Sequence, residues 1–92
     1  MSIWIESETL IRMLQAAQIR AARALLAWRQ EDLAKAAKVG LATIARIEQG
    51  EGTVQGNFST IMKIQHALET EGISFFAEPE GGIGVRLVKK PR

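Results

Sequence analysis

The feature that most restricts the fold is a very short connection between two short helical patterns. Apolar residues at helical spacing mark one helix over 30–37 and another over 41–49, and only Lys38, Val39 and Gly40 separate them. Three residues cannot reverse the chain into a long antiparallel helix pair, so we expect two short helices that cross at a steep angle, a helix-turn-helix. The apolar wedge expected to fix this crossing consists of Leu33, Val39, Ile44 and Ile47.

Longer helical patterns flank this pair. From about Glu8 to Trp28, apolar side chains recur near helical spacing without Pro or Gly, which predicts one helix or two, with Ser7 able to cap the start. Asn57 or Ser59 can cap a last helix that runs to about residue 71, before a glycine stops it. The face of this helix that we expect to be buried consists of Phe58, Ile61, Ile64 and Leu68.

The periodicity changes in the last part of the chain. Residues 73–76 and 84–89 are rich in β-branched and aromatic side chains, and the link between them is rich in turn residues, which predicts a β-hairpin with one side packed on the helices. A lone two-stranded hairpin is marginal in water, and its open edges invite pairing. We therefore divide the chain into a helical domain, 1–72, and a hairpin with a basic tail, 73–92, as a candidate dimerisation element. The apolar residues 3–5 either pack on the chain's own core or dock on a second subunit.

The side-chain inventory argues against an enzyme. The absence of Cys excludes thiolate metal sites and cysteine nucleophiles, and the single histidine, His66, has no partner for a His-rich zinc site or a Ser-His-Asp triad. We expect no catalytic residue, no metal and no cofactor. No apolar run approaches the ~18 residues of a membrane span, and the first ten residues lack the basic and apolar regions of a signal peptide. We therefore expect a cytoplasmic protein with no membrane partner.

Positive charge is concentrated in two segments. Residues 12–46 carry seven Lys and Arg against two acids, and residues 83–92 carry four against none, although the formal net charge is only +2. A segregated basic surface is typical of nucleic-acid binding, because it neutralises phosphates.

Residues 30–50 read QEDLAKAAKVGLATIARIEQG. This stretch resembles, without a gap, the helix-turn-helix of the phage-repressor-like (Xre/Cro type) transcriptional regulators, whose pattern is Gln-x-x-Leu-Ala, Gly-Val-Ser and Thr-Ile-Ser-x-Ile-Glu-x-Gly. The resemblance implies a mainly α fold, a four- to five-helix lambda-repressor-like DNA-binding domain, here followed by the β-hairpin. Two residues depart from the pattern. Lys38 stands where the turn glycine is usual, at a cost of roughly 1 kcal/mol, and Gly40 replaces the serine that caps the recognition helix.

The same resemblance implies a set of DNA-binding residues. Gln30 matches the glutamine that grips a phosphate and supports the recognition helix, and Arg46 matches a position that reaches base edges in the major groove. We favour Arg46 for base recognition, because a guanidinium can bind guanine O6 and N7 together. Without this match to the family pattern, Arg46 would be an ordinary surface charge. Arg29, just before Gln30, is the better phosphate candidate among the neighbouring cations. The full set of predicted DNA contacts is Arg29, Gln30, Leu41, Ala42, Thr43 and Arg46.

Other residues are assigned to structure. Arg23 and Glu48 match a family pair that joins the first helix of the domain to the recognition helix. Trp28 is expected to close the core, and His66 to be a partly exposed helix residue.

These features predict a small regulator that binds double-stranded DNA sequence-specifically, as a repressor acting by operator occupancy. We expect a homodimer, since one helix-turn-helix reads too few base pairs to be selective. The alternative is an antitoxin or accessory subunit that binds a protein partner, such as a toxin, and autoregulates through the same DNA-binding head.

Overall fold

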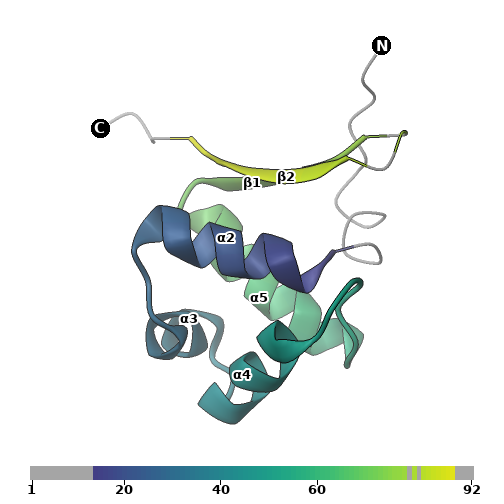
Figure 1. Cartoon of the computed structure of the whole chain (residues 1–92). Helices are drawn as coiled ribbons and strands as arrows, with labels where there is room; N and C mark the ends of the chain where they lie inside the picture. The colour runs from purple at the N-terminus through teal and green to yellow at the C-terminus, as the bar shows by residue number, and fades with distance from the viewer. Residues whose placement is uncertain (1–13, 79, 81, 89–92) are drawn as a thin grey trace.

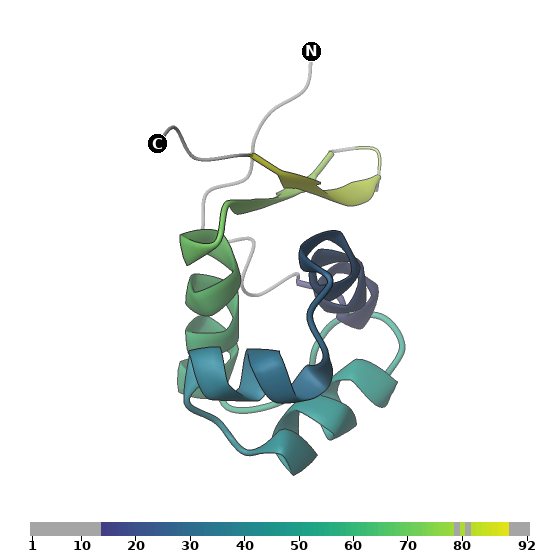
Figure 2. The ribbon, with the colours of Figure 1, turned by 90° about the vertical axis from the view of Figure 1, so that its left-hand side faces the viewer.

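The computed structural model of the chain describes residues 14–78, 80 and 82–88. In these residues four helices precede a two-stranded sheet: α2 (Ala16–Leu26), α3 (Gln30–Ala37), α4 (Leu41–Gln49), α5 (Phe58–Thr70), β1 (Ile73–Ala77) and β2 (Ile83–Leu87). The hairpin lies across one end of the molecule, over α2 and α5, whereas α3 and α4 form the opposite end (Figures 1 and 2). The predicted mainly α fold with a C-terminal hairpin is confirmed.

The first described helix is shorter than the pattern predicted. A continuous helix over 8–28 is wrong, because Gln15 is extended and forms a β-bridge with Thr53. The Ala16 N–H donates to the Gly52 carbonyl at 3.0 Å, which connects the start of α2 to the loop after α4. At the other end Ala27 adopts the left-handed conformation, φ 56°, so the helix ends before Trp28. Periodicity could not reveal this pairing between distant backbone segments. The expected cap at residue 7 and the apolar residues 3–5 lie outside the described residues.

The helix-turn-helix agrees with the prediction to the residue. The connection is Lys38, Val39 and Gly40, and Gly40 is the N-cap of α4. Lys38 has the left-handed conformation, φ 58°, that the usual glycine would adopt without strain. The Val39 N–H donates to the Ala34 carbonyl at 3.1 Å, which closes the end of α3. The wedge is confirmed: Leu33, Ile44 and Ile47 are buried, and Val39 is partly buried against them.

Helix α5 begins where the sequence predicted, with one error in its buried face. Asn57 is the cap, and its Oδ1 accepts from the Ser59 N–H at 2.8 Å. Phe58 was expected in the core but is 51% exposed. As the first residue of α5 it is in register with Ile61, but spacing does not tell where along the helix axis the core ends. The other predicted core residues of this helix, Ile61, Ile64 and Leu68, are buried.

The hairpin packs one face on the helices, as predicted, and each strand differs slightly from its expected bounds. The strands are antiparallel, with Phe75 opposite Val85. Ile73, Phe75 and Ala77 are buried in the same core as the helices. The buried Gln18 of α2 attaches the sheet, because its Nε2 donates to the carbonyls of Phe76 at 3.2 Å and Gly84 at 3.0 Å. The basic residues Lys89, Lys90 and Arg92 lie outside the described residues.

No helix in the described residues has the length and apolarity that crossing a bilayer requires.

Candidate nucleic-acid interface

Helix α4 has one packed face and one open face. Ile44, Ile47 and Glu48 are buried against the other helices. On the open face Leu41 is 45% exposed, and Ala42 and Arg46 are also exposed. Helix α4 lies at the end of the molecule away from the hairpin (Figure 1). Four of the six predicted DNA contacts therefore lie on α4: Leu41, Ala42, Arg46 and the half-buried Thr43.

The buried Glu48 side chain anchors α4 to the neighbouring helices. It is only 2% exposed, and both carboxylate oxygens accept hydrogen bonds from Arg23 of α2 at 2.7 Å, from Nε and Nη2. The Gln30 Nε2 donates to the same carboxylate at 3.2 Å. Such a two-point guanidinium–carboxylate contact fixes distance and orientation together. The predicted Arg23–Glu48 pair is confirmed, and it holds α4 to α2 and α3.

The charge of Arg23 is stabilised by this arrangement. Hydrogen bonding to Glu48 raises the pKa of Arg23 above its ordinary value, and burial opposes this rise only in part. The guanidinium is therefore charged at any physiological pH. Its Nη1 also donates to the Trp28 carbonyl at 2.9 Å, so one side chain links the end of α2 to α4. Trp28 itself is partly buried against the core, as predicted.

The N-terminus of α3 carries the other two predicted DNA contacts. Arg29 is the N-cap, and its backbone N–H donates to Asp32 Oδ2 at 2.8 Å. The Arg29 side chain is 76% exposed and lies 3.8 Å from Glu31, a surface pair of little energetic value. Gln30 is half-buried, because its amide faces Glu48. The structure thus places the Gln30 side chain, at the start of α3, in contact with Glu48 of α4.

Sequence reasoning missed Arg20. Arg20 is an exposed residue of α2, but its Nη1 donates to the Glu48 backbone carbonyl at 2.6 Å, with the Gly50 carbonyl 3.5 Å away. The available signal was the spacing of Arg20 and Arg23, which puts both on one face of a helix.

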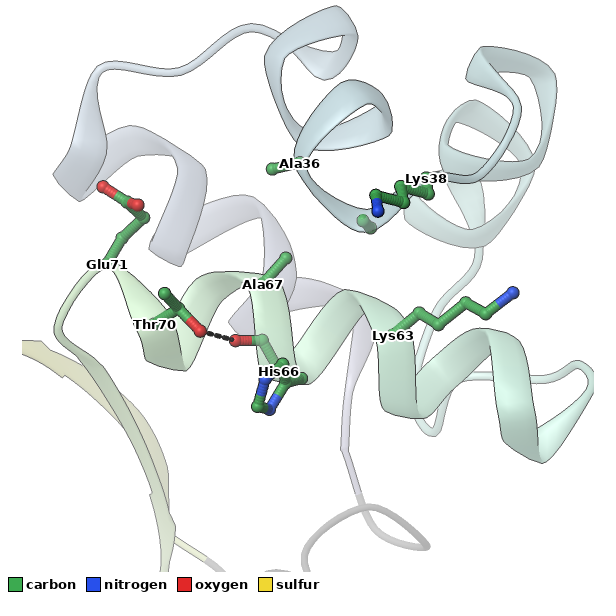
Figure 3. A pocket seen from close by; sticks show the side chains of 8 residues that line it. Ala36, Lys38, Lys63, His66, Ala67, Thr70 and Glu71 are labelled. Atoms are coloured by element: carbon green, nitrogen blue, oxygen red, sulfur yellow. Dashed lines mark hydrogen bonds between the residues drawn. The ribbon is translucent and has the colours of Figure 1, made fainter.

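A hollow of about 350 Å³ lies between α3 and α5, apart from the Glu48 cluster. Ala36, Ala37 and Ala67 contribute small apolar side chains to it. Figure 3 shows that Lys63 and His66 extend away from each other, so the polar groups do not converge on one point. His66 is exposed, in line with the prediction for it. The hollow therefore lacks the convergent polar groups of a ligand site.

The described part of the chain is a helical domain with a tight helix-turn-helix, whose second helix is anchored by a buried carboxylate and exposed on its outer face. These features define a helix-turn-helix DNA-binding domain. Comparison with protein families agrees: a helix-turn-helix family matches residues 19–71, from within α2 to just beyond α5. The chain belongs to this family, of the Xre or lambda-repressor-like type, and is a sequence-specific DNA-binding transcriptional regulator. No match was found among curated proteins or among solved structures.

Proposed function

We propose that this protein is a repressor that acts by occupying its operator, with α4 inserted in the major groove of double-stranded DNA. The observation that carries the proposal is the division of α4 into two faces. Ile44, Ile47 and Glu48 are buried, whereas Leu41 and Arg46 are exposed on a helix that lies at the edge of the molecule. A protein that covers an operator excludes the polymerase without any chemistry of its own.

Base recognition is assigned to the open face of α4. Arg46 binds guanine O6 and N7, a contact that discriminates between bases by ~1 to 3 kcal/mol. Leu41 and Ala42 offer apolar contact to thymine methyl groups, and Thr43 bonds a base or a phosphate. Because this face has few hydrogen-bonding groups, DNA shape supplies part of the selectivity.

Phosphate binding is assigned to the start of α3. Arg29 is well exposed there, and a helix N-terminus favours an anion. One hydrogen on the Gln30 amide nitrogen is directed to Glu48, and the second can serve a phosphate. These two residues would fix the register of the protein on the duplex, while α4 reads the sequence.

We further infer that the protein binds as a homodimer through the groove between α2 and β2. This groove has a volume of about 210 Å³ and is lined by Ala17, Gln18, Ala21, Ile83, Gly84 and Val85, none of them charged. Among the described residues β2 pairs only with β1, which leaves its outer edge for a second copy. To read two half-sites about 34 Å apart, the two-fold axis of this dimer must bring both copies of α4 to the same face of the duplex.

The same apolar groove supports the second candidate, an antitoxin or accessory subunit that binds a different protein. Sedimentation of the purified chain separates the two. A stable dimer that Ala21→Lys dissociates, while the matched Ala36→Lys on α3 leaves it intact, supports self-association. A monomer that co-purifies with a second chain supports the antitoxin.

Footprinting on the DNA upstream of the protein's own gene tests the function. We expect protection of a two-fold symmetric site, affinity that falls steeply with salt, and loss of selectivity in Arg46→Ala with the fold intact. An identical footprint from Arg46→Ala, or affinity that hardly changes with salt, would refute the proposed interface.

A further inference from the structure

Helix α4 ends differently from the other described helices. Helices α2, α3 and α5 each end with a cap residue whose backbone N–H donates back to a carbonyl of the last turn. Gly50, which follows α4, is instead extended, with φ −70° and ψ 167°, and its N–H does not donate back to a carbonyl of α4. The last carbonyls of a helix need donors from elsewhere.

Arg20 on α2 supplies a donor to one of these last carbonyls. Its Nη1 donates to the Glu48 carbonyl at 2.6 Å and lies 3.5 Å from the Gly50 carbonyl. A cation at this end also interacts favourably with the helix dipole. One turn along α2, Arg23 holds the Glu48 carboxylate. Two arginines of one helix therefore hold a single residue of α4, one by its backbone and one by its side chain.

The position of this contact connects it to recognition. Arg46 belongs to the last turn of α4, the turn that Arg20 closes. Terminal turns fray when their carbonyls are unsatisfied, and fraying here would displace the side chain proposed to read the bases.

We propose that Arg20 is a positioning residue: it caps the recognition helix and the start of the following loop, and so fixes how Arg46 is presented to DNA. The DNA part of this inference rests on the proposed function. Arg20 is also exposed, so the rival role is an ordinary phosphate contact.

The salt dependence of binding separates the two roles. Each phosphate contact contributes about 0.9 to the slope of log affinity against log salt, so losing a phosphate ligand lowers the slope by about one and weakens all sequences alike. Losing a positioning residue leaves the slope unchanged and reduces the preference for the operator over other DNA.

The experiment uses the full chain with Arg20→Met, which removes every donor, and Arg20→Lys, which keeps a charged donor on a shorter side chain. Arg29→Met is the matched control, an exposed arginine assigned to phosphate. Affinity is measured on the footprinted duplex and on unrelated duplex DNA across a salt series. Amide hydrogen exchange of α4, with α3 as the internal reference, is measured without DNA.

For Arg20→Met we expect faster exchange confined to the last turn of α4, about tenfold weaker operator binding, an unchanged salt slope and partial rescue by Arg20→Lys. Arg29→Met should lower the slope and leave exchange unchanged. Unchanged exchange in Arg20→Met, or a slope lowered as in Arg29→Met, overturns the positioning role. If the wild-type chain protects no DNA, the proposed function fails, whereas the exchange measurement still decides whether Arg20 caps α4.

Discussion

Arg23 on α2 and Glu48 on α4 meet through two hydrogen bonds of 2.7 Å, across 25 positions of sequence. The carboxylate is almost completely buried and the guanidinium is one-fifth exposed, so this pair is a buried ion pair with fixed geometry and not a surface contact. The pair sets the distance between α2 and α4, the helix proposed to enter DNA.

Glu48→Gln should destabilise the fold by about 2–3 kcal/mol. The substitution leaves Arg23 without its counter-charge, and breaking a buried pair costs about 3–5 kcal/mol, reduced here because Arg23 is partly exposed. Urea denaturation measures the change. Glu31→Gln, which breaks the exposed pair with Arg29, is the control and should leave stability unchanged. Equal urea midpoints for Glu48→Gln and wild type would contradict a stabilising role for the Arg23–Glu48 pair.

Lys38→Gly should stabilise the fold by about 0.5–1 kcal/mol. Lys38 has φ 58°, a conformation that costs a side chain about 1 kcal/mol and costs glycine little, although glycine also gains entropy in the unfolded chain. Ala36→Gly, at an exposed helical position of α3, should instead destabilise by about 1 kcal/mol. Thermal melting of the two variants should shift in opposite directions, and a shared downward shift would show that the turn is unstrained.

Gly72→Ala should destabilise the fold by more than about 2 kcal/mol. Gly72 joins α5 to β1 with φ 100°, and a Cβ there would collide with the Val88 carbonyl oxygen. Gly50→Ala is the control, since its φ is −70° and its Cβ would lie 3.6 Å from the nearest atom, the Ile47 carbonyl oxygen. Denaturant midpoints compare the two, and similar losses would mean that the turn at 72 can adjust.

Arg46→Ala and Arg29→Met should weaken DNA binding in different ways. Arg46→Ala should cost about 1–3 kcal/mol on the operator and much less on unrelated DNA, because it removes a base contact. Arg29→Met should weaken both alike and lower the salt slope by about one, because it removes a phosphate contact. Binding titrations on both duplexes at several salt concentrations measure these effects. Reversed patterns would exchange the two assignments.

Local patterns predicted the elements of the helix-turn-helix correctly because neighbouring residues determine them. The bounds of α3 and α4 and the buried wedge follow from helical spacing and from three residues that allow only one kind of crossing, whereas the cap at Gly40 came from the family pattern. The pair of Arg23 and Glu48 was reached through the family pattern, since spacing alone does not bring two distant helices together.

Contacts between distant segments decided the rest. Helix α2 starts at Ala16 because Gln15 pairs with Thr53, and Phe58 is exposed because the core ends before it. The sequence indicates only that Arg20 is a surface cation. The packing of α2 against α4 is what brings its guanidinium to the Glu48 carbonyl. The sequence alone thus determined that the two short helices α3 and α4 form and which of their residues form the wedge, because those properties depend on neighbours along the chain. The tertiary structure decided where helices begin and which side chain closes α4, because hydrogen-bond partners are chosen by distance in space.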